Sequence, residues 1–261
     1  MRGPIVIPVV DPEIIPDKNP IHAHLPQIAG PGGGALLLLV SPVRTGKSVL
    51  INNLLLNDEF YDAQERFDST TIISNTIAND VTSRFLLKAF ETHDSYNDSI
   101  IDGIVNSQKK YEKEDQPEIA VVLDDCLGSI KREARINHLC SRFRHYNIKL
   151  LVISSQNFRM CSPIIRQNAT NVIIGSPFPN AKELGKVAEE YGDSFGGAKN
   201  WMKIYKLATP EKYCFLHMDL QSNPPLAYRC FETLIAEGPN IIGPSSKKIK
   251  ESEDLKSDEE E

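Results

Sequence analysis

The residues with the clearest chemistry form the segment Ser-Pro-Val-Arg-Thr-Gly-Lys-Ser at positions 41–48. In such a segment backbone N–H groups surround the phosphates of a nucleotide, the lysine reaches the β and γ oxygens, and the last hydroxyl binds Mg²⁺. The usual pattern begins with glycine, and Ser41 replaces it without removing a phosphate ligand. The predicted nucleotide-binding residues are Ser41, Pro42, Val43, Arg44, Thr45, Gly46, Lys47 and Ser48. The alternative is an ordinary strand–turn–helix with no ligand.

Two carboxylates form the second chemical element. Residues 119–123 are an apolar run that leads directly into Asp124 and Asp125. Open α/β sheets bind ligands at the carboxyl ends of their strands, so the pair is predicted to lie beside the phosphates. We expect Asp124 to hold Mg²⁺ together with Ser48, and Asp125 to orient or deprotonate an attacking water. An acidic turn after a strand is the alternative.

A third polar group, Gln156, follows the apolar run 149–154. A side-chain amide at a strand end can hydrogen-bond both a water and a γ-phosphate, so Gln156 is a candidate sensor of an intact triphosphate. A polar strand end without a ligand is equally compatible with this segment taken alone.

These groups require a scaffold of alternating strands and helices, and the hydrophobic pattern supplies one. The predicted strands are 35–40, 70–74, 119–124, 149–154 and 171–175. The predicted helices are 47–56, 81–92, 98–112, 131–145, 180–191 and 197–206. Segments 213–219 and 226–234 are predicted to form a C-terminal β-hairpin. This alternation is typical of an α/β domain with a mainly parallel central sheet flanked by helices.

The chain divides into three predicted parts. Residues 1–34 contain seven prolines and end in a glycine-rich stretch, which indicates an extended arm. Residues 35–238 form the predicted nucleotide-binding domain. Residues 239–261 are polar and charged, and are predicted to be a disordered tail.

Composition limits the possible classes of function. The 261 residues are 41% hydrophobic and 25% charged, as in ordinary globular proteins, and no apolar run is long enough to cross a membrane. Half of the formal charge of −6 lies in the last 15 residues, so the remainder is nearly neutral and lacks the basic surface of a monomeric nucleic-acid binder. The five cysteines have no zinc-site spacing. We therefore expect a soluble intracellular protein with reduced thiols.

Several segments together resemble a known family. The segment 39–48, the run Val-Leu-Asp-Asp at 122–125, Ser-Arg-Phe-Arg-His-Tyr-Asn-Ile at 141–148, Ser-Ser-Gln at 154–156 and Pro-Ile-Ile-Arg-Gln-Asn at 163–168 are similar to segments of the DNA-packaging ATPases of large double-stranded DNA viruses, the poxvirus type. That group belongs to the FtsK/HerA lineage of P-loop NTPases. The likeness spans about residues 35–235, and it departs at Ser41 and at Asp125, where the lineage usually has glutamate.

The resemblance implies a RecA-like fold and a homo-oligomeric ring that uses ATP and Mg²⁺ to move double-stranded DNA into a capsid. It also implies contacts with capsid or portal-vertex proteins, and a location in the virion and in the host-cell cytoplasm. In a ring, an arginine from one subunit can stabilise charge on the γ-phosphate held by its neighbour. Arg144 is the first candidate for this role and Arg166 the second, with a surface arginine as the alternative for each.

Other functions remain open at this stage. A nucleoside or small-molecule kinase would use the same loop with an acceptor in place of water. A non-enzymatic assembly factor would bind nucleotide without turnover. Two basic clusters are candidates for contacts with DNA, or else are solvated helix faces. One consists of Lys109, Lys110 and Lys113, and the other of Lys199, Trp201, Lys203 and Lys206.

Overall fold

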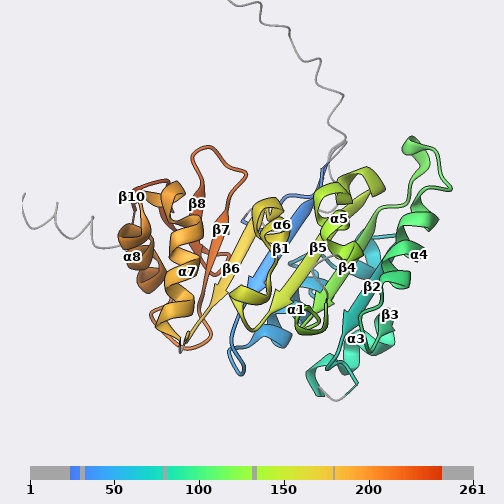
Figure 1. Cartoon of the computed structure of the whole chain (residues 1–261), viewed down its shortest axis with the longest axis horizontal. Coiled ribbons are helices and arrows are strands. Elements are labelled where there is room, and N and C mark those ends of the chain that lie inside the picture. The colour runs from blue at the N-terminus through green and yellow to red at the C-terminus, as the bar shows by residue number, and fades with distance from the viewer. Residues whose placement is uncertain (1–23, 30–32, 79–80, 131–133, 179, 243–261) are drawn as a thin grey trace, which may run out of the picture.

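The structure, a computed structural model, describes residues 24–29, 33–78, 81–130, 134–178 and 180–242 (Figure 1). A ten-stranded sheet runs through this part of the chain. Its strands are β1 (Ala35–Val40), β2 (Ser69–Ser74), β3 (Glu91–His93), β4 (Ile119–Asp124), β5 (Ile148–Ser155), β6 (Asn171–Gly175), β7 (Phe215–Asp219), β8 (Leu226–Arg229), β9 (Thr233–Glu237) and β10 (Asn240–Ile241). The helices are α1 (Lys47–Leu56), α2 (Ala63–Arg66), α3 (Arg84–Ala89), α4 (Asp98–Gln108), α5 (Arg135–Arg142), α6 (Pro163–Asn168), α7 (Ala181–Tyr191) and α8 (Ala198–Ala208).

The sheet has a parallel part and an antiparallel part. Strands β1 to β6 pair in parallel, and β7 to β10 continue the sheet antiparallel from the free edge of β6. The predicted α/β class, the mainly parallel sheet and the C-terminal hairpin are therefore confirmed. The strands predicted for the parallel part agree with β1, β2, β4, β5 and β6 to within one residue at each end.

Both faces of the sheet are covered, which explains why the parallel strands are apolar throughout. In β1, Leu36 and Leu38 pack on the face covered by α4 to α8, whereas Leu37 and Leu39 pack against α1, α2 and α3. Figure 1 shows the sheet running between these helices. Residues Leu25 and Ile28, which precede the domain, belong to the second face, so this part of the predicted arm packs on its own domain.

The strand order places the chemical groups. The sheet runs β10-β9-β8-β7-β6-β1-β5-β4-β2-β3, so β5 lies between β1 and β4. All three strands are parallel, and the register pairs Leu39 with Ser154, and Ser154 with Asp124. The loop after β1, the carboxylates after β4 and the amide after β5 consequently meet at one edge of the sheet.

The structure corrects the prediction in several places. The predicted helix 98–112 ends at Gln108, so Lys109, Lys110 and Lys113 follow α4, and neither α2 nor β10 was predicted. The predicted helix 81–92 ends at Ala89, and Glu91–His93 form β3, because the open edge of β2 offers backbone partners there. The segment 226–234 is split into β8 and β9 by a turn in which Cys230 has a φ of 53°. Helix α6 was not predicted, although Ser162 before Pro163 is a typical helix start and its hydroxyl accepts a hydrogen bond from the Ile165 N–H.

The limits of the predicted parts fall partly outside the described residues. This applies to residues 1–23 and 30–32 of the arm and to residues 243–261 of the tail. Among the described helices, none is both long and apolar enough to cross a membrane. Cys126, Cys140 and Cys161 are buried and form no disulfide among the described residues, and burial raises the pKa of the Cys126 thiol to about 12.

Candidate nucleotide-hydrolysis site

The phosphate-loop segment joins β1 to α1 at the carboxyl edge of the sheet. Gly46 begins α1 with a φ of 89°, a left-handed conformation that favours glycine, and Arg44 also has a positive φ of 62°. No side chain caps the first turn of α1, and that turn has no acidic residue. Its N–H groups and the positive end of the helix dipole therefore remain available to an anion.

Ser41 has a structural explanation. Its side chain is buried and packs so closely on Gly175 that a Cβ at Gly175 would lie 2.0 Å from the Ser41 Oγ. The hydroxyl bonds to that of Thr45, and the Thr45 Oγ1 donates to the Pro42 carbonyl oxygen at 2.6 Å. The buried Ser41 hydroxyl thus stabilises the conformation of the loop through this hydrogen bond.

Lys47 lies against the two carboxylates. Its ammonium is 3.5 Å from Asp124 Oδ1 and forms a closer ion pair with Asp125 Oδ2. The three side chains are nearly buried, with exposed fractions of 8%, 10% and 13%. Burial in a low-dielectric site strengthens such pairs.

Asp124 is fixed by hydroxyl groups from both neighbouring strands. Ser154 of β5 donates to its Oδ1, and Ser74 of β2 donates to its Oδ2 at 3.2 Å. Ser48 and Asp124 line the same small cleft. Carboxylate and hydroxyl oxygens are the donors that Mg²⁺ prefers, and it commonly combines one or two of them with substrate phosphates, so these residues fit a Mg²⁺–nucleotide complex.

Asp125 is held differently from Asp124. Its backbone is left-handed, with a φ of 53°, and its N–H donates to the carbonyl oxygen of Ser154 at 3.3 Å. Gln156 donates from its Nε2 to Asp125 Oδ2 at 2.9 Å. A left-handed aspartate is uncommon, and here its carboxylate contacts both Gln156 and Lys47.

The two arginines lie away from these groups. Arg144 is exposed in a short 3₁₀ helix, Phe143–Tyr146, and its Nε donates to the Gly34 carbonyl oxygen at 3.2 Å. Gly34 precedes β1, so Arg144 lies at the opposite edge of the sheet, about 20 Å from the phosphate loop by the length of a six-residue strand. Arg166 lies in the last turn of α6, where it pairs with Glu190 at 3.3 Å and stacks on Phe158.

The structure also shows contributors that the sequence prediction lacked. Ser74 and Ser154 were not predicted as site residues, although both stand at polar strand ends that could have indicated them. Tyr213 and Lys212, from the turn before β7, line a cavity that the phosphate loop also lines. Nothing in their local sequence marks them, since only the antiparallel addition of β7 to β6 brings them there.

Comparison of the sequence with protein-family models gave no match, and neither did comparison with curated proteins. Comparison of the structure with solved structures gave matches. The DNA-packaging ATPase B204 from Sulfolobus turreted icosahedral virus is 17% identical, with a TM-score of 0.57 over 77% of this chain and 99% of that chain. B204 from Sulfolobus turreted icosahedral virus 2 in complex with AMPPCP is 19% identical, with a TM-score of 0.54 over 77% and 99%.

This chain has the fold of a viral genome-packaging ATPase. The resemblance predicted from the sequence is therefore confirmed at the level of the fold. The same protein of the second virus in complex with ATP-gammaS is 18% identical, with a TM-score of 0.53 over 78% of this chain and all of that chain. The match covers nearly the whole of these solved chains and about three quarters of this chain.

Proposed function

We propose that this chain is an ATP-hydrolysing motor that moves double-stranded viral DNA into a capsid during virion assembly. The observation that carries the proposal is the meeting of Lys47, Asp124, Asp125 and Gln156 at one sheet edge, on the fold of a packaging ATPase. The relative crystallised with AMPPCP binds a nucleotide analogue, which supports the same ligand class here.

Each residue of the site has a proposed role. The backbone from Ser41 to Gly46, with Lys47, holds the phosphates, and Ser48 and Asp124 hold Mg²⁺, which supplies charge neutralisation at the phosphates when it is bound. Asp125 orients the attacking water and accepts its proton, and Gln156, which donates to Asp125, senses the γ-phosphate. Lys47 must exchange its present contacts with the carboxylates for contacts with the phosphates, which frees Asp125 for this task.

The proposed ring follows from the position of the cations. Lys47 is the basic side chain that pairs with the carboxylates, while Arg144 lies at the far edge of the sheet. If Arg144 stabilises the transition state, it would therefore act in the site of a neighbouring subunit. We propose Arg144 for this role because it is exposed and bonded only to a backbone oxygen and to the ring of Phe143 among described groups, with Arg166 second because Glu190 already pairs with it.

The DNA surface is proposed to include the exposed lysines of one cluster, Lys109, Lys110 and Lys113. The other cluster is revised by the structure, because Trp201 is fully buried and donates from its indole to the sulfur of Met218 at 3.1 Å. Its indole therefore belongs to the core and is unavailable to stack on a base. We further propose residues 35–238 as the ATPase domain, an N-terminal arm and a charged tail, capsid or portal-vertex proteins as partners, and the virion and host-cell cytoplasm as locations.

The test is steady-state ATP hydrolysis by the purified chain with and without long duplex DNA. Lys47→Ala and Asp125→Asn serve as inactive variants, and asparagine tolerates the left-handed backbone that alanine would strain. Stimulation by DNA that both substitutions abolish supports the motor. Turnover that requires a nucleoside acceptor in place of water would instead identify a kinase.

A further inference from the structure

A cavity of about 740 Å³ adjoins the phosphate loop on the side away from the carboxylates. One wall is formed by the loop and by Val49, Leu50 and Asn53 of α1. The other wall comes from distant segments, with Ile173 of β6 and Phe215 of β7 as its apolar part. The space lies beyond the N-terminus of α1, where the phosphates are proposed to bind, and its lining is largely apolar.

Tyr213 stands at the mouth of this cavity. Its ring edge lies 3.4 Å from the position of a Cβ built on Gly46, so the ring flanks the loop directly. Its side chain is 57% exposed and its φ is 73°, which is a genuine outlier for a bulky residue. The Lys212 ammonium lies 4.7 Å from the ring centroid. A strained, exposed aromatic beside a phosphate loop has no packing role that would explain it.

We propose that the purine base of the bound nucleotide occupies this cavity and stacks on Tyr213. The inference rests on the proposed function only in taking a nucleoside triphosphate as the ligand. Aromatic side chains hold bases through their π-faces, and stacking is worth ~1–3 kcal/mol per base. The apolar side chains of the cavity remove the opposite face of the base from water.

The lining also indicates which bases are accepted. Asn53 is exposed on α1, and its amide presents one donor group and one acceptor that can exchange places by rotation. Among the described residues that line the cavity, none carries a carboxylate that would pair with the N–H groups of guanine. Stacking combined with a reversible amide distinguishes adenine and guanine weakly, so we expect both purine nucleoside triphosphates to bind.

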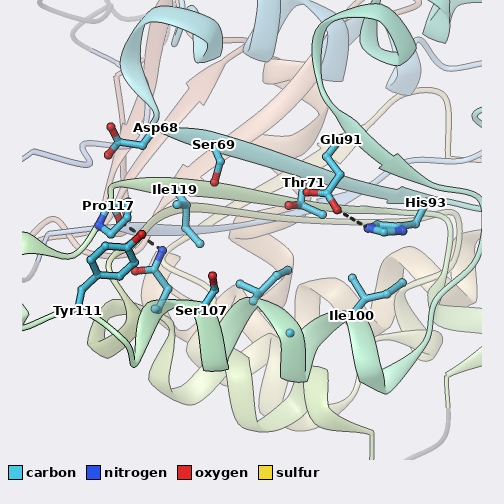
Figure 2. Close-up of a pocket in the computed structure, with 13 residues that line it drawn as sticks. Asp68, Ser69, Thr71, Glu91, His93, Ile100, Ser107, Tyr111, Pro117 and Ile119 are labelled. Atoms are coloured by element: carbon cyan, nitrogen blue, oxygen red, sulfur yellow. Dashed lines mark hydrogen bonds and ion pairs between the residues drawn. The ribbon is translucent and has the colours of Figure 1, made fainter.

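A second cavity supplies the control. Figure 2 shows this space of about 590 Å³ between α4 and strands β2, β3 and β4, with Tyr111 at one end and the Glu91–His93 pair at the other. Tyr111 is 49% exposed, close to the value for Tyr213, and it does not line the cavity beside the phosphate loop. Tyr111→Ala therefore removes an equally exposed ring without touching the proposed base site.

The experiment measures equilibrium binding by calorimetry in the presence of Mg²⁺, with AMPPCP, GMPPCP and inorganic tripolyphosphate as probes. Tyr213→Ala should weaken AMPPCP and GMPPCP about tenfold, within the stacking range, and leave tripolyphosphate within twofold. Tyr213→Phe should keep wild-type affinity for all three probes, since it keeps the ring. Tyr111→Ala should change none of them.

Three results would overturn the proposal. Unchanged AMPPCP affinity in Tyr213→Ala would place the base elsewhere, and equal weakening of tripolyphosphate would show that the ring only supports the loop. A wild-type preference above tenfold between the two nucleotide probes would refute weak base discrimination. Failure of the wild-type chain to bind tripolyphosphate would instead refute the phosphate site and the proposed function, while absence of DNA stimulation with normal binding would refute the motor alone.

Discussion

Two groups of buried polar residues, one beside the parallel part of the sheet and one in the antiparallel part, differ in their charge balance. At the carboxyl edge of the parallel part, Lys47, Asp124 and Asp125 form a charged cluster, and of these three only Lys47 also lines the cavity beside the loop. In the antiparallel part, His217 is fully buried among aromatic rings, stacked on Tyr228 and bonded to Asn171 at 3.1 Å.

This difference indicates a ligand site at the charged cluster and a purely structural role for the His217 cluster. The charged cluster holds two carboxylates against one lysine, so it retains an excess of negative charge that a metal ion can balance. The His217 cluster is neutral and closed, and burial lowers the pKa of that imidazole to about 3. Polar residues of similar burial are therefore expected to affect turnover in the first region and folding in the second.

The largest effect on turnover is expected when the arginine that a neighbouring subunit supplies to the charged cluster is removed. Arg144→Ala should lower turnover in the assembled protein by ~10³–10⁵-fold, because an arginine in that role stabilises transition-state charge, and should leave AMPPCP affinity unchanged. Mixing Arg144→Ala with Lys47→Ala subunits should restore part of the activity, since one supplies an intact loop and the other an intact arginine. Steady-state hydrolysis of the mixture measures this.

Arg166→Ala is the matched control for that experiment. Because Arg166 is paired with Glu190 and stacked on Phe158, its loss should lower the unfolding midpoint and should leave most of the turnover intact. If Arg166→Ala abolished turnover and Arg144→Ala did not, the assignments of the two arginines would be exchanged.

A smaller effect is expected at Asp125. Asp125→Asn should reduce turnover ~10²–10⁴-fold, the usual contribution of a general base, with nucleotide affinity within a few-fold of wild type. The unfolding midpoint should stay constant, since asparagine accepts the left-handed backbone at this position. Single-turnover hydrolysis and urea denaturation measure the two quantities. A loss below tenfold would mean that another group activates the water.

The smallest effect on activity, and the clearest on folding, is expected at His217. Its folded pKa of about 3 is below the unfolded value of 6.5, so the unfolded chain binds the proton first as the pH falls. This contribution to stability is complete above pH 6.5 and is lost between pH 6.5 and 3, at about 1.4 kcal/mol per pH unit. Urea unfolding at pH 7.5, 5.5 and 4.5 measures the slope.

His217→Gln should flatten that slope, because glutamine keeps a polar partner for Asn171 and does not titrate. His145→Gln, at an exposed position, should leave the slope unchanged. Equal slopes in wild type and His217→Gln would show that titration of His217 does not control acid unfolding.

Much of the candidate site was predictable because its residues belong to short local patterns. The loop segment, the carboxylates after 119–123 and the amide at Gln156 each follow an apolar run whose length and composition indicate a buried strand. The errors have a common cause. Residues 91–93 form a strand only because β2 offers an open edge. Trp201 is buried by packing between α8 and the sheet, which the local sequence does not show, so it was predicted to belong to a DNA-binding cluster.

By itself the sequence determined the phosphate loop, the strands and helices around it, and the order in which the acidic pair and the amide follow, because backbone conformation and hydrophobic periodicity are set by neighbouring residues. Only the tertiary structure decided that β5 separates β1 from β4, that Tyr213 flanks Gly46, and that Arg144 lies at the opposite edge from Lys47. These placements depend on the pairing and packing of segments far apart in the chain, whose free energy no local pattern records.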